Sequence, residues 1–378
     1  MKKTIYLDAA ASSLKPKSVI DAQMDFMENH YANSGRGMCA RANYVDEMVA
    51  SARQKTAGFI GAKSSEQIVF TSGTTDGLNR IVHIIKDSYK LSHSWVICIS
   101  DMDHHSARMP WEELQHKNGI KIVACPLDSD FNLDFSLVDR IDVFVITAMS
   151  NVMGAPQDVK GLIASAKQIN PNVITIVDAA QYVAHLPIDV SDWGCDFLCF
   201  SGHKIGADTG LGIMYIKNPD KWFPDKFGGG MIAKIQGSLA TNDSHWTLSK
   251  SPDKFEAGTL PLTQIAGLSF AIDYLTEHKD NQNLIKYMHN ELSKIDKIKI
   301  ITSPDAFVLT FIIDDMHPID FGALIGAYGI CLRAGTMCAS WLHKLMGYDG
   351  TIRISTGWWN TKDEIDTAIS IIKKILKV

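Results

Sequence analysis

Hydrophobic residues in the first two thirds of the chain gather in short runs separated by longer stretches of mixed polarity. The runs are apolar throughout, which is typical of strands covered on both faces of a sheet. Stretches between them, such as 162–168, have helical spacing. This alternation predicts a mostly parallel sheet with helices on both faces. We expect strands at 68–70, 95–99, 120–124, 143–147, 173–177, 197–200 and 212–216.

The pattern changes near Gly258, where long amphipathic helices begin. Thr361 and Glu364 form a capping box that marks the start of the last helix. We expect a large domain over residues 1–262, whose first part, up to about residue 20, packs on a smaller α/β domain over 263–378. The elements expected in the second part are helices at 264–277, 283–295, 318–328 and 361–376, and strands at 297–301, 308–313, 330–333 and 351–355.

The composition is that of an ordinary globular protein. Of 378 residues, 46% are hydrophobic and 21% charged, which excludes disordered and fibrous classes. The net charge is −5 without a basic stripe, so we expect no nucleic-acid partner. No stretch approaches the ~18 uncharged apolar residues of a membrane span, and no signal core precedes Asp8, so we expect no membrane association and a cytoplasmic location.

The seven cysteines are scattered without a disulfide-like rhythm. Cys98, Cys125 and Cys199 lie in strand-like runs, where we expect them to be buried and reduced. Cys195 and Cys199 lack the second pair of ligands that zinc would need. We therefore expect no metal site.

A small polar loop follows the first expected strand. Residues 71–77 read Thr-Ser-Gly-Thr-Thr-Asp-Gly and lead into a helical pattern. Backbone N–H groups at a helix start, with hydroxyls beside them, suit a phosphate, so Gly73, Thr74 and Thr75 are candidate phosphate ligands. An ordinary capped helix would use the same residues, and the loop alone leaves both interpretations open.

Two later strands deliver polar side chains at their carboxyl ends, where open α/β sheets bind ligands. Asp178 ends one of them, and a buried carboxylate there needs a cation, such as a protonated pyridine nitrogen, unless it only caps the next helix. Lys204 follows another strand in Ser-Gly-His-Lys. A charged lysine is costly there, so a lowered pKa or an imine is favoured over a surface-loop lysine.

The fourth feature lies in the second part of the chain. Cys338 follows a strand in a loop of small residues, where exposure is expected. Arg353 interrupts an apolar strand pattern, and its guanidinium suits a carboxylate. An inter-strand salt bridge is an equally open interpretation of Arg353.

Together these segments resemble the class V aminotransferase family, and within it the group II cysteine desulfurases (the SUF-type enzymes) and selenocysteine lyases. The likeness runs nearly from end to end. The short segment from Arg333 to Cys338 resembles group II rather than the longer cysteine loop of group I. The matching segments are 6–11, 73–75, 103–105, 110–111, 150–154, 178–181, 201–204, 228–232, 255–259, 333–338 and Arg353.

The resemblance implies a pyridoxal 5'-phosphate (PLP) dependent transferase of fold type I. Lys204 would bind the cofactor as a Schiff base and later move the Cα proton of the substrate. Asp178 would pair with the pyridine nitrogen and keep the ring an electron sink. His104 would stack on the ring and serve in proton transfer, and Gln181 would donate to the ring oxygen.

The resemblance also implies the remaining ligands and the reaction. Asn151 and Arg353 would bind the substrate carboxylate, with Arg333 as a further substrate ligand. Asn151 also counts among the cofactor-binding positions. Cys338 would attack the sulfur of L-cysteine as a thiolate, leave alanine, and pass a persulfide to an acceptor protein of sulfur or iron–sulfur metabolism. The phosphate would be held by Gly73, Thr74, Thr75, Ser201 and His203, joined by Thr259 from the second subunit of a homodimer.

The chain departs from the family at three places, of which the first lies near the expected entry to the site and the last near the expected subunit contact. A His-Arg-Gly-x-His stretch reads Gly35-Arg36-Gly37-Met38-Cys39 here. The two histidines that usually precede the cysteine are Thr336 and Met337, and the Pro-Asn after Thr259 is Leu260-Pro261. These changes leave the sulfur acceptor open, and none of them touches the expected cofactor set.

We therefore expect a PLP-dependent cysteine desulfurase. The altered residues around Cys338 leave open a selenocysteine or cystine lyase, or another class V transaminase or epimerase in which Cys338 is a bystander. A non-enzymatic sulfur-relay or partner-binding protein would need a broken cofactor set, and this one looks intact. A nicotinamide enzyme is disfavoured because no Gly-x-Gly-x-x-Gly follows the first strand.

Overall fold

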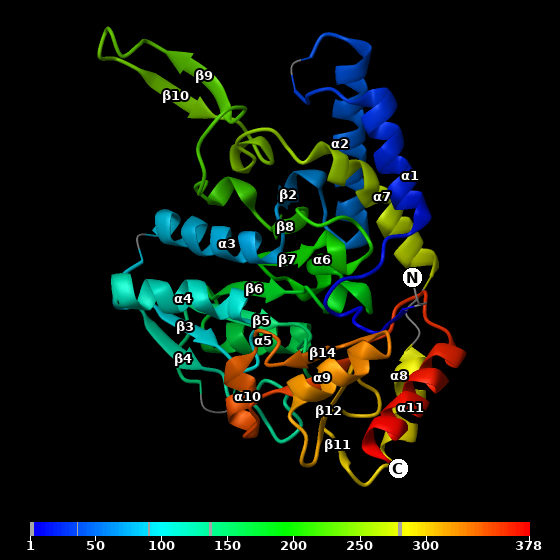
Figure 1. The fold of residues 1–378 in the computed structure, drawn as a ribbon. Coiled ribbons are helices and arrows are strands. Elements are labelled where there is room, and N and C mark those ends of the chain that lie inside the picture. Colours follow the sequence, from blue (N-terminus) through cyan, green and yellow to red (C-terminus); the bar gives the residue numbers. More distant parts are fainter. Residues whose placement is uncertain (1–3, 36, 90, 136–137, 279–281) are drawn as a thin grey trace.

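The centre of the molecule is a seven-stranded sheet with the order β2-β8-β7-β6-β5-β3-β4 (Figure 1). The computed structural model describes residues 4–35, 37–89, 91–135, 138–278 and 282–378. Every strand of this sheet except β8 runs in one direction, so the expected mostly parallel, mixed sheet is confirmed. The strands are β2 (Ile68–Thr71), β3 (Val96–Ile99), β4 (Lys121–Ala124), β5 (Val143–Thr147), β6 (Ile174–Asp178), β7 (Phe197–Ser201) and β8 (Gly212–Ile216), each within one residue of its expected bounds.

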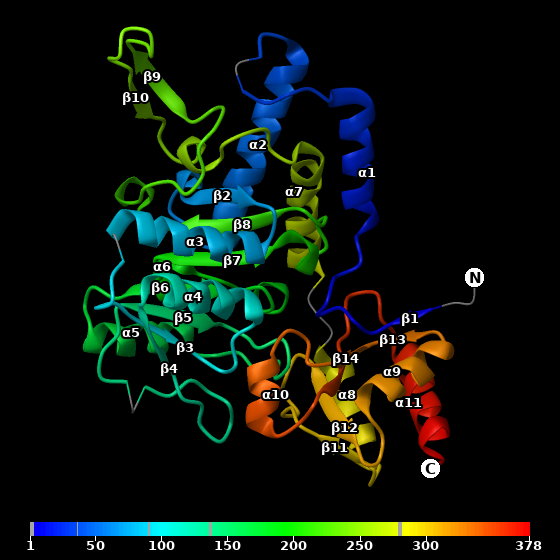
Figure 2. The ribbon, with the colours of Figure 1, turned by 60° about the vertical axis from the view of Figure 1, so that its left-hand side comes forward.

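Helices cover both faces of this sheet, which explains the wholly apolar strands (Figure 2). On one face, α3 (Thr74–Tyr89) and α4 (His105–Asn118) share a core with Val69, Val143 and Val145. On the other face, α2 (Ala40–Phe59), α5 (Val159–Ile169) and α7 (Leu262–Glu277) share a core with Phe70 and Phe144. Shorter elements are α1 (Lys17–Asp25), η1 (Phe26–His30), η2 (Ser65–Gln67), η3 (Tyr182–Ala184), α6 (Val190–Trp193), η4 (Gly202–Lys204), η5 (Pro219–Lys221) and η6 (Asp253–Phe255).

The second part of the chain builds a four-stranded sheet with the order β11-β12-β15-β14, antiparallel throughout. Thr361 caps α11 through the expected capping box with Glu364. The elements are α8 (Gln282–Leu292), β11 (Ile298–Ile300), β12 (Leu309–Ile313), α9 (Pro318–Ala327), β13 (Ile330–Cys331), β14 (Arg333–Gly335), α10 (Ser340–Met346), β15 (Thr351–Ile354) and α11 (Lys362–Leu376).

The single strand expected at 330–333 is wrong. It divides at Leu332 because its two halves pair with different partners: β13 pairs in parallel with β1 (Ile5–Tyr6), and β14 pairs with β15. The pairing of β1 attaches the N-terminal segment to the second part of the chain. Leu7 accordingly lies in the same hydrophobic cluster as Leu309.

A hairpin of β9 (Ile232–Gln236) and β10 (His245–Leu248) projects from the body of the molecule (Figure 1). It carries exposed apolar side chains, with Ile235 68%, Leu239 91% and Trp246 50% exposed. Among the described residues, no helix is both long and apolar enough to cross a membrane.

Candidate active site

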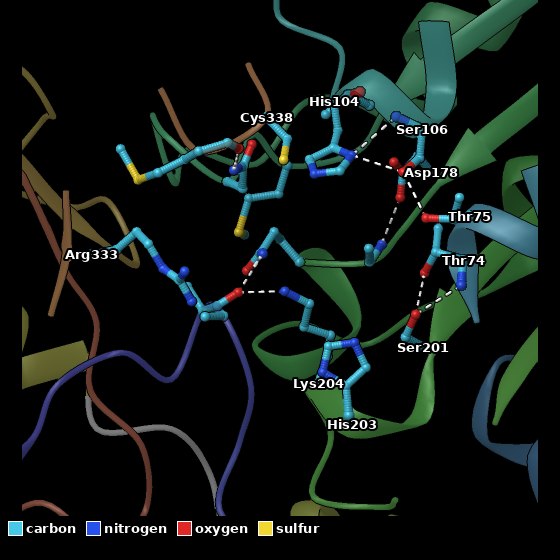
Figure 3. A pocket seen from close by; sticks show the side chains of 18 of the residues that line it. Thr74, Thr75, His104, Ser106, Asp178, Ser201, His203, Lys204, Arg333 and Cys338 are labelled. Carbon is cyan, nitrogen blue, oxygen red and sulfur yellow. Dashed lines mark hydrogen bonds between the residues drawn. The ribbon is translucent and has the colours of Figure 1, made fainter. Parts of the chain in front are cut away.

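The carboxyl ends of β6 and β7 and the starts of α3 and α4 meet the second sheet at a cavity of about 310 Å³. Figure 3 shows Cys338 and His104 on one side of this cavity and Lys204 and His203 on the other, with Thr74, Thr75 and Ser201 at one end and Arg333 at the opposite end. The lining side chains include Thr74, Thr75, His104, Asn151, Asp178, Gln181, Ser201, His203, Lys204, Arg333, Cys338 and Arg353, so the structure brings together all the expected site residues except Gly73 and Thr259.

The end of the cavity at α3 is built from hydroxyls and a helix start. Ser201 Oγ accepts a hydrogen bond from Thr74 N at 2.8 Å and lies 2.7 Å from Thr74 Oγ1. Gly73 stands just behind, against β8, where a Cβ on Gly212 would lie 2.5 Å from Gly73 Cα. Only glycine at position 212 permits this close approach, which sets the loop where its N–H groups can meet an anion.

Asp178 lies at the end of β6 and is 5% exposed. It accepts a hydrogen bond from Ala180 N at 3.0 Å. Burial raises the pKa of Asp178 to about 6, against that hydrogen bond and the charge of Lys204. A cation placed beside this carboxylate would relieve the cost of its burial.

Lys204 projects into the cavity from η4, directly after β7. Burial, followed by the charge of Arg353, lowers its pKa to about 7, so a large share of this amine is neutral at neutral pH. Its Nζ donates to Ala10 O, which also accepts from Gln181 Nε2 at 2.8 Å. The N-terminal segment thus forms one wall of the cavity, and its carbonyl orients two of the expected cofactor ligands.

Both cavity histidines are neutral at physiological pH. Burial, followed by the charge of Lys204, lowers the pKa of His104 and of His203 to about 4. His104 caps α4 by accepting from Ser106 N at 3.1 Å through Nδ1, which places its proton on Nε2. Ser106 Oγ in turn lies 2.7 Å from Thr75 Oγ1. The sequence did not single out Ser106, and a hydroxyl two residues after an N-cap histidine was its only signal.

Arg353 reaches the cavity from β15 and is 2% exposed. Its Nη2 lies 2.9 Å from Asp8 Oδ1, and its Nη1 donates to Asn151 O at 2.9 Å. Arg333 Nη2 lies 2.9 Å from the other oxygen of Asp8, so one carboxylate joins both arginines. Burial lowers the pKa of Arg353, against the charge of Asp8. Its buried Nε has no hydrogen-bond partner in the described part of the chain.

Asp8 therefore holds two arginines of the cavity, a contact to which the sequence analysis gave no role. Its motif, residues 6–11, was noticed as part of the family resemblance only. The pairing joins positions 345 apart in the chain, so no local pattern could have indicated it.

Cys338 lies in the loop between β14 and α10 and is exposed. Met337 O accepts from Asn151 Nδ2 at 2.8 Å, so the amide expected at the substrate also anchors this loop. Cys98, Cys125, Cys195 and Cys199 are buried and, like Cys338, unpaired.

Two expected features lie elsewhere. Thr259 lines a separate hollow with Ser34, Gly230 and Glu256, not the cavity that holds Ser201. Arg36 lies outside the described residues, while Gly35 N donates to Asp46 Oδ1 at 2.7 Å. The phosphate end of the cavity thus lacks, within one chain, the threonine that the resemblance supplies from a second subunit.

The model of the Aminotransferase class-V family matches residues 5–367. The chain belongs to the class V aminotransferase family. It is 33% identical over 384 residues to a cysteine desulfurase of Pectobacterium atrosepticum, covering 98% of this chain and 92% of that protein. A cysteine desulfurase of Yersinia pestis is 32% identical over 388 residues, covering 99% of this chain and 94% of that protein.

Solved structures agree with this membership. The apo cysteine desulfurase of Thermococcus onnurineus superposes with a TM-score of 0.92 at 29% identity, covering 99% of this chain and 95% of that one. An S-sulfonic acid form of a cysteine desulfurase from Escherichia coli gives a TM-score of 0.89 at 30% identity, with the same coverage. The enzymes of this family depend on PLP, and this chain is a PLP-dependent enzyme of fold type I.

The cavity of the class V chain fits that cofactor. Hydroxyls and a helix start suit its phosphate, and the buried Asp178 suits a protonated ring nitrogen. Lys204, with its lowered pKa, presents an amine that can bind an aldehyde. The unpartnered Nε of Arg353 remains for a carboxylate.

Proposed function

We propose that this chain is a cysteine desulfurase, which converts L-cysteine to L-alanine and keeps the sulfur as a persulfide on Cys338. The observation that carries the proposal is one cavity that combines an exposed cysteine, a lysine of lowered pKa and a buried arginine with an unpaired nitrogen. The cysteine desulfurases among its relatives support the same reaction over the lyase and transaminase alternatives.

Residues at the end of the large sheet and at the starts of α3 and α4 would hold PLP. Lys204 would bind it covalently, Asp178 would pair with its ring nitrogen, His104 would contact the ring, and Gln181 would donate to the ring oxygen. Thr74, Thr75, Ser201 and His203 would hold its phosphate, on the loop that Gly73 shapes. When bound, PLP draws electrons from the Cα of an amino acid and so makes its proton and side chain labile.

The substrate would be oriented by its carboxylate. Arg353 offers its free Nε to one carboxylate oxygen, assisted by Arg333 and by the amide of Asn151. Asp8 holds both guanidiniums in place without closing that nitrogen. The neutral form of Lys204, a large share of this amine at neutral pH, would then move the proton at Cα.

The sulfur step would belong to Cys338. Its Sγ attacks the sulfur of the substrate, an S–S bond forms, and the Cβ–S bond breaks with its electron pair going to carbon. The carbon takes up a proton and leaves as alanine, so the sulfur is oxidised to the sulfane level as the carbon is reduced. The exposure of Cys338 supports transfer of this sulfur to an acceptor protein.

We further propose a homodimer in which Thr259 of each chain completes the phosphate site of the other. The separation of Thr259 from the Ser201 cavity supports this arrangement, as do the exposed apolar side chains of the β9–β10 hairpin. Subunits with Lys204→Ala and subunits with Thr259→Ala should each be defective, whereas mixed dimers should regain activity in one of their two sites. No recovery on mixing would contradict the shared site.

Two broader assignments accompany this function. Residues 1–262 form the cofactor domain and 263–378 a smaller domain, a division supported by the separate hydrophobic cluster around Phe311, although α7 packs in the first core and so joins the two parts. The cytoplasm is the proposed location, supported by seven unpaired cysteines, which are typical of reducing compartments.

The test compares two exposed cysteines. PLP-loaded Cys338→Ala and Cys39→Ala proteins are given L-cysteine, and alanine and bound sulfane sulfur are measured. Cys39→Ala should match the unchanged protein, and Cys338→Ala should lose the bound sulfur and nearly all alanine formation. Normal sulfide release by Cys338→Ala in the presence of a reductant would argue for a lyase instead.

A further inference from the structure

The loop that carries Cys338 has an unusual backbone. Met337 and Cys338 have φ angles of 50° and 56°, two consecutive non-glycine residues in the left-handed region. Such residues are uncommon and persist only where their surroundings impose the conformation. The contacts that impose it therefore decide where the thiol lies.

His105 at the start of α4 binds the backbone of the loop at Cys338 and at Ser340. Its backbone N donates to Cys338 O at 2.9 Å, and its Nε2 accepts from Ser340 N at 3.2 Å. Because Nε2 acts as the acceptor, the ring is neutral with its proton on Nδ1. One residue of α4 thus fixes the two peptide groups that follow Cys338.

Trp341 adds a second attachment three residues after Cys338. Its ring meets the His105 ring edge-on at 5.2 Å between centroids and 85° between planes. The guanidinium of Arg108 lies over the Trp341 ring, 4.0 Å from its centroid. Trp341 thereby contacts two side chains of α4, the His105 ring and the Arg108 guanidinium.

Arg108 is itself held rigidly. Its Nη1 lies 2.6 Å from Asp101 Oδ1 and its Nε lies 2.9 Å from Glu112 Oε1, and its side chain is 15% exposed. A guanidinium fixed by two carboxylates cannot follow the tryptophan if the loop moves. The stack therefore ties the loop to α4 at a defined position.

The helix behind the loop does not depend on this stack. In α10, Leu342 is fully buried, and His343 bonds Ala339 O at 2.9 Å and Thr351 Oγ1 at 3.0 Å. Removing the Trp341 ring should thus leave α10 in place and release only the loop residues 336–338 from α4.

We propose that His105, Arg108 and Trp341 form a clamp that positions the Cys338 thiol for attack on the substrate sulfur, an inference that rests on the proposed desulfurase reaction. Trp341 and Arg108 are positioning residues, since neither lines the cavity in the described chain. The clamp acts on the thiol and leaves the cofactor and the carboxylate site unchanged.

The experiment uses the Cys39→Ala protein, in which Cys338 is the one remaining exposed cysteine among the described residues. Trp341→Ala is compared with Leu345→Ala, an exposed apolar residue on the same helix. Alkylation of the Cys338 peptide by iodoacetamide is followed by mass spectrometry, together with kcat and KM for alanine formation, the PLP absorbance and the Tm.

Release of the clamp should raise the alkylation rate of Cys338 about fivefold, as expected for a locally opened loop. It should lower kcat about tenfold, the effect of a misplaced reacting group, with KM, PLP absorbance and Tm unchanged. Trp341→Phe should recover most of the rate because a ring remains under Arg108, and Arg108→Gln should resemble Trp341→Ala.

Equal alkylation and kcat in Trp341→Ala and Leu345→Ala would overturn the proposal, and so would a parallel loss of PLP and of Tm in Trp341→Ala. Failure of the desulfurase assignment is distinguishable from either result. In that case the Cys39→Ala protein itself forms no alanine, or forms it without bound sulfur on Cys338, while the alkylation comparison still reports whether Trp341 holds the loop.

Discussion

The Asp8 carboxylate between Arg333 and Arg353 offers a sharp test of how this site is held together. Asp8→Asn keeps the size of the side chain and removes its charge. Arg353 then remains as a buried cation, its side chain 3% exposed, whose acceptors are two neutral oxygens, Asn151 O and the amide oxygen introduced at position 8. Arg333, whose side chain is 49% exposed, loses little because water takes the place of the carboxylate.

The magnitude follows from that difference in burial. Breaking a buried ion pair costs about 3–5 kcal/mol of folding free energy. The low end applies because the amide oxygen introduced at position 8 still accepts one hydrogen bond from Arg353. For a chain of 378 residues, the entropy of unfolding is about 0.8 kcal/mol/K, so a loss of about 3 kcal/mol lowers Tm by about 4 °C. The less constrained Arg353 should also raise KM for L-cysteine about tenfold.

Calorimetry and initial rates provide the assay. Asp305→Asn is the matched control, because it removes a carboxylate from an ion pair with Lys286 whose side chains are 52% and 79% exposed. That control should change Tm by less than about 1 °C. The reasoning is refuted if Asp8→Asn and Asp305→Asn have the same Tm, or if Asp8→Asn loses stability with no change in KM.

Three further outcomes follow from the cofactor end of the cavity. Ser106→Ala removes the hydroxyl 2.7 Å from Thr75 Oγ1 and should weaken PLP binding about three- to tenfold. The control Ser92→Ala breaks an exposed hydroxyl pair with Ser94 and should leave the PLP affinity unchanged. Equal PLP affinities of the two variants in an absorbance titration would refute this prediction. Asp178→Asn should weaken PLP binding more than about tenfold. It should not lower the Tm of the cofactor-free protein, because a neutral amide replaces a costly buried carboxylate. A lowered Tm with full PLP affinity would count against this prediction. The rate of PLP incorporation should rise as pH increases through about 7 and then level off, because the neutral amine of Lys204 is the nucleophile and its pKa is lowered to about 7. A rate that rises only near pH 10.5, the ordinary pKa of a lysine, would contradict the lowered pKa.

Much of the large sheet could be predicted from sequence because burial on both faces makes its strands continuous apolar runs. The antiparallel direction of β8 leaves no such trace, since Gly212–Ile216 is as apolar as its parallel neighbours. The β9–β10 hairpin was missed for the opposite reason. Its strands are mostly exposed, so they carry no core-facing pattern to detect.

The candidate site likewise contains residues that the sequence reveals and residues that only the folded chain reveals. Asp178 and Lys204 could be found because one ends and the other follows a buried strand, where a charged side chain is conspicuous. Asp8 and Ser106 could not, because their roles arise from contacts with Arg353 and with Thr75 that only the folded chain creates. The division of the strand expected at 330–333 likewise depends on the distant β1.

The central claim is that Cys338 takes the sulfur of L-cysteine. The most direct measurement gives the PLP-loaded protein L-cysteine with isotopically labelled sulfur in a single turnover and analyses the Cys338 peptide by mass spectrometry without reductant. We predict that this peptide gains one labelled sulfur atom and that alanine forms in equal amount. Labelled sulfide in solution, with alanine formed and the Cys338 peptide unchanged, would contradict the account.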